Sequence, residues 1–303
     1  MDVKKNARLR ELINQPGIVV APGCHDGLTA RLVQQNGFQV CYMGGNGTMA
    51  SYLGIPDIGI GTATEMITRA RYLAETLDIP LVCDADTGYG DVSSVVRTVR
   101  EYEAAGVSGI HFEDQVMPKK CGAMEGVQVV PVEEICMKLR AALEARRDPN
   151  FMIIARTDSF NTYGIEETIA RSKKFWDCGV DMLMPENLVT REDVARVAYE
   201  LTNYKSPYRD DKPVVLYDVC EFTEGQIFSN EELEAMGYKF VIHPLGSILL
   251  EARALNRYYS EYAAKGSTKD MYNEGIFEKR QVYQDILGYS DAMALREKYK
   301  TEK

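Results

Sequence analysis

The stretch LVCDADTGYGDVSSVVRTVREYEAAGVSGIHFE, residues 81–113, decides the fold of this chain. It begins with an apolar run at 81–86 and ends with a second one at 109–113. Between them, 92–105 carries apolar residues at three- and four-residue spacing, which is typical of a helix packed on a core. Both runs are continuously apolar, as expected of strands buried on both faces of a parallel sheet. The stretch therefore predicts a strand–helix–strand unit with parallel strands.

The same unit recurs along the chain. Eight short apolar runs, each followed by a polar or glycine-rich cluster, lie at 17–22, 38–43, 81–86, 109–113, 152–158, 182–186, 214–218 and 240–244. Helical spacing of apolar residues occurs between them at 63–77, 92–105, 132–145, 165–178 and 191–201. Eight alternations of strand and helix predict an α/β fold of the (β/α)8 TIM barrel type. The main alternative, a doubly wound open sheet, would be expected to carry a Gly-x-Gly-x-x-Gly turn that 17–27 lacks.

The composition indicates one soluble globular domain over 1–303. The length, the 45% hydrophobic content and the absence of a linker fit a single large core. A net charge of −10 argues against a nucleic-acid or anionic-membrane surface. Seven cysteines without a Cys-x-x-Cys pair fit reduced thiols, and no apolar run is long enough to span a membrane. We therefore expect a cytoplasmic protein with a small-molecule ligand.

The segment 247–303 is not needed to close a barrel. Its first part, 247–264, has a helical pattern, and a polar stretch at 265–269 precedes further helix to about Tyr299. We expect this C-terminal helical extension to be received by a partner subunit.

Acidic side chains follow many of the predicted strands. In a (β/α)8 barrel the carboxyl ends of the strands meet at one face, where catalytic groups gather. Several carboxylates cannot share a site of low dielectric without a cation, and oxygen ligands suit Mg2+ or Mn2+ better than zinc. Taken singly, each acid has a plain structural explanation, such as capping a helix or meeting solvent. The acidic residues at or near strand ends are Asp57, Asp84, Asp86, Glu113, Glu186 and Asp218.

A cysteine lies in a basic, glycine-rich stretch shortly after the strand that ends at Glu113. The sequence Lys119-Lys120-Cys121-Gly122 places a thiol between ammonium groups and a glycine. Positive neighbours favour a thiolate, and glycines let a loop fold over a ligand. A basic surface turn is the simpler reading of this segment alone. The three histidines, His25, His111 and His243, form no legible Ser-His-Asp arrangement.

Taken together in order, these motifs resemble the isocitrate lyase/phosphoenolpyruvate mutase superfamily over almost the whole chain. The resemblance is greatest to the branch of 2-methylisocitrate and 2,3-dimethylmalate lyases, which carries the cysteine loop. The motifs that carry it are Tyr42-Met43-Gly44-Gly45, Leu53-Gly54-Ile55-Pro56-Asp57, Asp84-Ala85-Asp86-Thr87-Gly88-Tyr89-Gly90, His111-Phe112-Glu113-Asp114-Gln115, Lys119-Lys120-Cys121-Gly122, Ala155-Arg156-Thr157-Asp158 and Pro185-Glu186.

The resemblance implies a homotetramer of barrels that exchange C-terminal helices, and a Mg2+-dependent carbon–carbon lyase. Cys121 would protonate the carbanion left by retro-aldol cleavage, and Arg156 would neutralise a carboxylate or enolate oxygen. Glu113 counts both among the catalytic residues and among the metal ligands, which would be Asp57, Asp84, Asp86 and Glu113. The substrate-binding residues would be Tyr42, Gly44, Gly45, Asn46, Gly122, Arg156, Glu186, Asp218, Cys220 and Arg280.

The chain departs from the lyase pattern at four positions. Lyases with this loop read Cys-Gly-His, whereas the third residue here is Ala123. After the seventh strand they place an asparagine and then a serine or threonine, where this chain has Asp218 and Cys220. Leu249 aligns with an arginine of the 2-methylisocitrate lyases. Each change removes a donor for a distal carboxylate, and Asp218 would repel one. We therefore expect a substrate with fewer carboxylates than isocitrate.

Other functions stay open at this stage. A hydrolase or decarboxylase acting on oxaloacetate or a related 2-oxo acid is the first alternative, because some relatives with that activity have the same loop. A phosphonopyruvate mutase or hydrolase is disfavoured by the cysteine loop. A non-catalytic metabolite-binding or scaffold protein would bind the metal and turn nothing over.

Overall fold

The structure is a computed structural model, and it describes residues 2–122, 124, 126–221 and 226–300. Each of the eight predicted strand regions contains a strand, and neighbouring strands pair in parallel. The strands of the described chain are β1 (Val19–Pro22), β2 (Cys41–Met43), β3 (Leu81–Asp84), β4 (Gly109–Glu113), β5 (Met152–Thr157), β6 (Met182–Pro185), β7 (Leu216–Asp218) and β8 (Phe240–His243).

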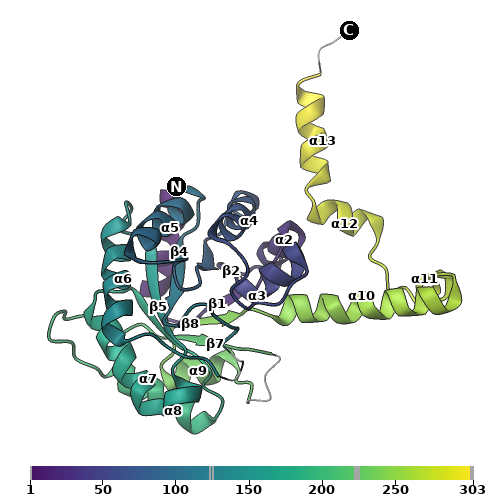
Figure 1. Ribbon diagram of the computed structural model, residues 1–303. Coiled ribbons are helices and arrows are strands. Elements are labelled where there is room, and N and C mark those ends of the chain that lie inside the picture. Colours follow the sequence, from purple (N-terminus) through teal and green to yellow (C-terminus); the bar gives the residue numbers. More distant parts are fainter. Residues whose placement is uncertain (1, 123, 125, 222–225, 301–303) are drawn as a thin grey trace.

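The strands close into a barrel. Hydrogen bonds join them in two sets, in the orders β1-β8-β7 and β2-β3-β4-β5-β6. Parallel bridges between Gly23 and Tyr42 and between Leu183 and Val215 connect the two sets at both seams. The helices surround the strands (Figure 1), which confirms the predicted α/β barrel and excludes the doubly wound sheet.

The five predicted helices are present with shifts of a few residues at their ends. They are α4 (Ala63–Thr76), α5 (Val92–Ala104), α6 (Val132–Ala145), α7 (Phe160–Asp177) and α8 (Arg191–Thr202). Further helices of the described chain were not predicted. One of them, α9, buries a single residue, Leu233, and leaves little periodicity to detect. The missed helices are α1 (Val3–Asn14), α2 (Gly27–Gln35), α3 (Gly45–Thr48), the π-helix η1 (Met49–Leu53) and α9 (Asn230–Met236).

Alternate strand residues face two different cores, because successive side chains of a strand point to opposite faces. Cys83 and Ile110 belong to the layer between barrel and helices, whereas Val82 and Ile154 belong to the barrel interior. The interior cluster also contains Leu9 of α1, which is fully buried. Helix α1 therefore packs on the interior core. In a barrel of this kind the functional site is expected at the carboxyl ends of the strands.

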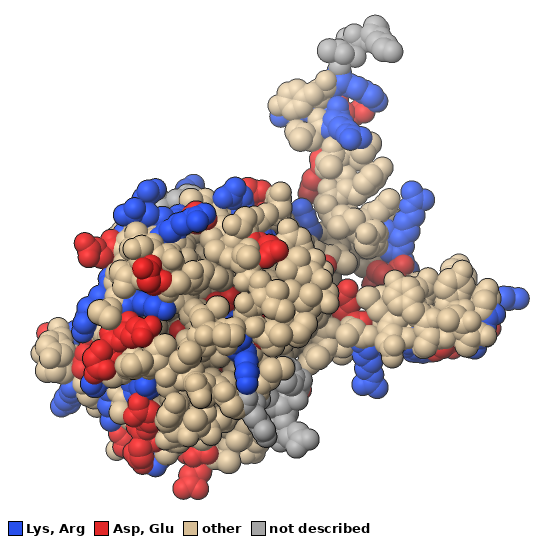
Figure 2. Space-filling view, in the orientation of Figure 1, with Lys and Arg blue, Asp and Glu red and all other residues tan. Residues whose placement is uncertain are grey.

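The C-terminal helices extend away from the barrel (Figure 1). Helix α10 (Gly246–Lys265) begins where the sequence predicted a helix, and α11 (Lys269–Asn273), α12 (Arg280–Ile286) and α13 (Tyr289–Lys298) follow it. No residue of α10, α12 or α13 is buried, and apolar side chains such as Leu250 and Tyr259 are exposed. In the space-filling view, uncharged side chains form much of the surface of this arm, with acidic and basic side chains interspersed along it (Figure 2).

No helix in the described ranges combines the length and the apolar character needed to cross a bilayer.

Candidate active site

The carboxyl ends of the strands enclose a cavity of about 440 Å³, a volume that includes the space at its mouth. Most of the predicted site residues lie in its wall, although they come from separate parts of the sequence. The lining residues are Tyr42, Gly44, Gly45, Asn46, Asp57, Asp84, Cys121, Gly122, Arg156, Glu186, Asp218, Cys220, Pro244 and Leu245.

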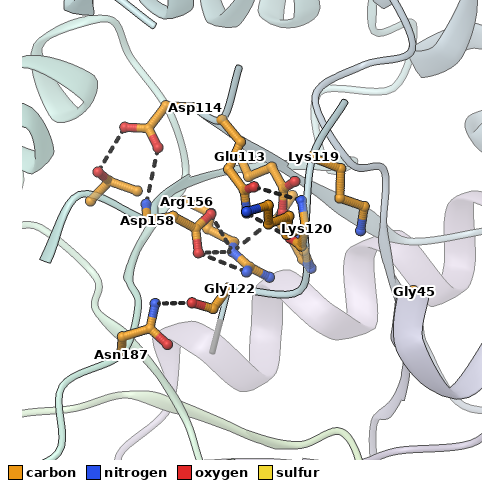
Figure 3. A network of polar contacts seen from close by, with 12 residues as sticks. Gly45, Glu113, Asp114, Lys119, Lys120, Gly122, Arg156, Asp158 and Asn187 are labelled. Atoms are coloured by element: carbon orange, nitrogen blue, oxygen red, sulfur yellow. Dashed lines mark hydrogen bonds and ion pairs between the residues drawn. The ribbon is translucent and has the colours of Figure 1, made fainter. Parts of the chain in front are cut away.

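A buried lysine lies among the carboxylates at one end of this cavity. The Nζ atom of Lys119 is 2.7 Å from Oδ1 of Asp57 and 2.5 Å from Oδ1 of Asp86, and the lysine side chain is only 2% exposed. In Figure 3 the side chain of Lys119 points toward Gly45. The Gly45 amide donates a 3.2 Å hydrogen bond to Oδ2 of Asp84. The sequence indicates Lys119 only as a basic neighbour of Cys121, because its pairing with Asp57 and Asp86 depends on the tertiary structure.

The titration of these groups reflects burial and mutual repulsion. Burial, together with the negative charges of Asp84 and Asp57, raises the pKa of Asp86 to about 6, although Lys119 offsets part of this effect. Burial alone would lower the pKa of Lys119, but the surrounding carboxylates outweigh it and raise that pKa above its ordinary value. The ammonium of Lys119 is therefore the cation that balances the acidic cluster in this structure.

Glu113 is the least satisfied member of the cluster. It is 1% exposed, and neither of its carboxylate oxygens accepts a hydrogen bond from any residue that the structure describes. Its nearest recorded cation is Nε of Arg156, at 3.6 Å from Oε2. Burial raises the pKa of Glu113 well above its usual value. An orphaned buried carboxylate beside three aspartates is the donor chemistry that a hard divalent cation prefers.

The carboxylates are nevertheless not arranged as a finished metal site. Within the described ranges, no three His, Cys, Asp or Glu side chains converge as a set that could hold an ion. The residues fit Mg2+ or Mn2+ in their donor chemistry, whereas Lys119 takes part of the space between Asp57 and Asp86. A metal ion would therefore have to displace the lysine ammonium before it could contact these two aspartates.

Arg156, at the end of β5, is held in place by Asp158. Its Nη2 lies 2.8 Å from Oδ1 of Asp158, and its Nε lies 3.1 Å from Oδ2 of the same carboxylate. The backbone of Asp158 is in turn held by Asp114, whose Oδ1 accepts a 3.0 Å hydrogen bond from the Asp158 amide (Figure 3). This two-point ion pair fixes the plane of the guanidinium in the cavity wall.

The cysteine loop lies over the cavity in a closed arrangement. The amide of Cys121 donates a 3.0 Å hydrogen bond to the carbonyl of Asp57. Nδ2 of Asn187 donates a 2.8 Å hydrogen bond to the carbonyl of Gly122 (Figure 3). Asn187 adopts a left-handed conformation with φ of 65°, which is uncommon for a residue other than glycine and often marks functional sites.

Gly122 has no space for a side chain in this arrangement. A Cβ atom added there would lie 2.3 Å from Oδ1 of Asp158 and 2.4 Å from Nη2 of Arg156. The glycine therefore lets the loop backbone approach the ion pair that holds Arg156.

The strands β2 and β4 contribute a packed polar pair. The hydroxyl of Tyr42 is 2.7 Å from Nε2 of His111, and the two rings stack with centroids 5.8 Å apart. Burial lowers the pKa of His111 to about 4, so the imidazole is neutral near pH 7 and serves as a packing and hydrogen-bonding residue. The backbone at Gly44, Gly45 and Asn46 lies in the cavity wall as expected.

The opposite part of the wall is acidic. Glu186 follows β6 and Asp218 ends β7, and their carboxyl groups hydrogen-bond to each other. Burial, and to a lesser extent the negative charge of Glu186, raises the pKa of Asp218 well above its usual value. Cys220 lines the same region.

Four of the predicted residues are not part of this wall: Asp86 and Glu113, which belong to the buried carboxylate cluster, and Leu249 and Arg280, which lie on the C-terminal helices. Arg280 lies at the exposed start of α12, on the arm that leaves the barrel, so it does not line the pocket of its own chain, and its place at a pocket stays a prediction. Leu249 is 39% exposed on α10, and Leu245 lines the cavity instead. Ala123 lies outside the described residues.

The raised pKa of Asp218 predicts a pH-dependent effect of replacing it. A carboxyl group whose pKa is higher in the folded than in the unfolded protein destabilises the fold as pH rises above its unfolded pKa of about 3.9. Asparagine does not titrate, so we expect the melting temperature of Asp218→Asn minus that of the wild type to increase from pH 4 upward. Thermal unfolding across pH 4 to 9 measures this, with the exposed Asp210→Asn as the matched control. A difference that is constant with pH would contradict the expectation.

Comparison with known proteins agrees with this geometry. The family model described as phosphoenolpyruvate phosphomutase matches residues 9–262. A 2,3-dimethylmalate lyase of Eubacterium barkeri is 42% identical over 82% of this chain and 83% of its own length. A 2-methylisocitrate lyase of Aeropyrum pernix is 35% identical over 93% of this chain and 87% of its own.

A solved structure gives the same result for the fold. The structure of oxaloacetate acetylhydrolase in complex with the inhibitor 3,3-difluorooxalacetate superposes with a TM-score of 0.86 at 30% identity, covering 97% of this chain and 96% of the other. The two relatives named above are carbon–carbon lyases. The chain therefore belongs to the phosphoenolpyruvate mutase/isocitrate lyase superfamily and is a carbon–carbon lyase.

Proposed function

We propose that this protein is a carbon–carbon lyase that depends on Mg2+ or Mn2+ and cleaves a 2-hydroxy dicarboxylic acid by retro-aldol chemistry. The products are a 2-oxo acid, pyruvate or glyoxylate, and a second carboxylic acid. The observation that carries the proposal is one cavity in which Cys121 and Arg156 face the buried carboxylate cluster. The named lyases at 42% and 35% identity support the same reaction class.

The carboxylate cluster would hold the metal through Asp57, Asp84, Asp86 and Glu113, directly or through water. When bound, the ion would supply positive charge to the 2-hydroxy acid end of the substrate, which the acidic cluster alone would repel. The orphaned oxygens of Glu113 support this assignment.

The protein's own groups perform the cleavage. The proton of the C2 hydroxyl passes to a carboxylate of the cluster, the C2–C3 bond breaks, and its electron pair moves onto C3 and the adjoining carboxylate. Arg156, held by Asp158, stabilises the negative charge that grows there. Cys121 then donates its thiol proton to C3 inside the closed loop, which keeps bulk water from the carbanion.

A second candidate function is hydrolysis or decarboxylation of oxaloacetate or a related 2-oxo acid. The similarity to oxaloacetate acetylhydrolase at 30% identity favours it. Both reactions use the same metal end and the same arginine, so the fold alone does not separate them.

The decisive experiment compares substrates in purified protein with Mg2+. We expect pyruvate to be released from 2,3-dimethylmalate or a related branched 2-hydroxy acid, with poor turnover of isocitrate and 2-methylisocitrate. Oxaloacetate turnover without any lyase activity would favour the second candidate. Metal binding without turnover of either class would contradict both enzymatic proposals.

The buried ion pairs of Lys119 predict a competition with the metal. Because the Lys119 ammonium lies between Asp57 and Asp86, we expect Lys119→Met to raise the affinity for Mg2+ by about tenfold, which corresponds to about 1.4 kcal/mol. Isothermal titration calorimetry with Mg2+ alone measures this without any substrate. Lys120→Met is the matched control, since it removes the neighbouring charge of the same loop. An unchanged or weaker affinity in Lys119→Met would show that the lysine does not oppose metal entry.

The exposed apolar arm supports a proposal for assembly. We propose that the chain forms one domain with 247–303 as a C-terminal extension, and that this extension packs on another copy within a homotetramer in the cytoplasm. The absence of buried residues in α10, α12 and α13 of the single chain supports this. Sedimentation analysis should give the mass of a tetramer, and a monomer at micromolar concentration would contradict the proposal.

A further inference from the structure

The acidic wall of the cavity is a candidate for recognising one particular part of the substrate. Glu186 and Asp218 line the same cavity as Cys121 and Arg156. The backbone of Glu186 is fixed by its amide, which donates a 3.0 Å hydrogen bond to the carbonyl of Thr157. The wall is therefore attached to the strand that carries Arg156.

This wall has unused hydrogen-bond acceptors. Glu186 is only 6% exposed, yet its Oε2 has no hydrogen-bond partner among the residues that the structure describes. Oδ1 of Asp218 is likewise buried and has no hydrogen-bond partner among the described residues. Glu186 and Asp218 hydrogen-bond to each other and so share one proton. Their four carboxyl oxygens still outnumber the single O–H donor between them. Leaving a buried acceptor unpaired costs about 1–3 kcal/mol, so a ligand that donates a hydrogen bond would relieve it.

The surroundings do not favour an anion at this place. The described lining of the cavity contains one cationic side chain, Arg156, and that guanidinium is already held by Asp158 at 2.8 Å. A further carboxylate, Glu221, lies close enough to raise the pKa of Asp218. A substrate carboxylate facing Glu186 and Asp218 would meet negative charge without a counter-ion.

From this arrangement, and on the basis of the proposed lyase function, we propose that Glu186 and Asp218 select a substrate whose C3 substituent ends in a hydrogen-bond donor, a hydroxyl or an ammonium group. An alkyl substituent leaves the acceptors unpaired, and a carboxylate is repelled. Sites built to hydrogen-bond one polar group discriminate strongly against analogues that lack it. The acid released by cleavage then carries a hydroxyl or amino group on its β-carbon.

A matched substrate series tests this inference. The series is 2-methylmalate bearing hydroxymethyl, aminomethyl, methyl or carboxymethyl at C3, and each member releases pyruvate on cleavage of the C2–C3 bond. We expect kcat/KM with Mg2+ to be at least about tenfold higher for the hydroxymethyl or aminomethyl compound than for the methyl compound, and lowest for the carboxymethyl compound. The ratio of the first two identifies which donor the wall prefers.

A variant separates electrostatic selection from pocket shape. Asparagine has nearly the shape of aspartate but supplies an amide donor and no charge, so Asp218→Asn should raise kcat/KM for the carboxymethyl compound about tenfold relative to the aminomethyl compound. Asp210→Asn, an exposed charge removal, should leave all ratios unchanged.

The outcomes distinguish this inference from the proposed function beneath it. Pyruvate release that is fastest from the methyl or carboxymethyl compound overturns the donor assignment and keeps the lyase. Release from no member of the series overturns the lyase proposal and the inference with it. An Asp218→Asn variant with unchanged ratios also overturns the assignment, because the wall would then not sense the substituent.

Discussion

Replacing the loop thiol should remove almost all lyase activity. Cys121→Ser keeps the size of the side chain but replaces an adequate proton donor by an alcohol that is far less acidic. General acid catalysis contributes about 10²- to 10⁴-fold, so we expect kcat for pyruvate release to fall by about 10³-fold. Steady-state kinetics with 2,3-dimethylmalate measures the loss.

The same variant discriminates between the two candidate reactions. A decarboxylation of oxaloacetate that uses the metal and Arg156 alone needs no thiol proton, so Cys121→Ser should retain most of that rate. Cys178→Ser, at a partly exposed cysteine after α7, is the matched control and should leave both rates unchanged. A lyase rate within about twofold of the wild type in Cys121→Ser would remove the cysteine from the proposed mechanism.

The second large effect is expected from one methyl group on the loop. In Gly122→Ala the new Cβ would lie 2.3 Å from Asp158 and 2.4 Å from Arg156, so the loop cannot close as it does in this structure. Misplacing catalytic groups by about 1 Å can cost about 10²-fold, and we expect kcat/KM to fall by at least that factor. The barrel should remain folded, because Gly122 belongs to neither hydrophobic cluster formed by the described residues.

Two further measurements make this prediction specific. The melting temperature of Gly122→Ala should stay close to that of the wild type while kcat/KM falls. Gly27→Ala is the matched control, since a Cβ there meets only Thr76, at 4.0 Å. Normal activity in Gly122→Ala would show that the closed loop seen here is not the arrangement in which catalysis occurs.

Much of the fold was predictable because its signals are local. The eight apolar runs coincide with β1 to β8, and helices with a long buried face, such as α5, stand out by their spacing. Short helices were missed where tertiary contacts, rather than sequence periodicity, hold them. Helix α2 buries only Ala30 and Val33 and depends on an Asp26 capping box to begin.

The residues of the candidate site were more predictable than the contacts between them. Asp84, Arg156 and Glu186 were found from their positions at strand ends, and the structure places them around one cavity. Arg280 is the exception within a single chain, because it lies on the C-terminal arm, whose direction depends on packing that the sequence does not reveal. Asn187, which holds the loop, stands beside Glu186 in the sequence but shows no signal except a backbone conformation seen only in the structure.

By itself the sequence determined the barrel, its order of strands and the acidic character of one end. The reason is that the spacing of hydrophobic residues and the polarity of strand ends depend only on residues that are close in the sequence. Only the tertiary structure decided which charges pair. Lys119 lies 33 positions from Asp86 along the chain, and Glu186 lies 32 positions from Asp218, yet each pair is in contact. The physical reason is that electrostatic interactions depend on distance and burial in space, and barrel closure sets both for residues that the sequence keeps apart.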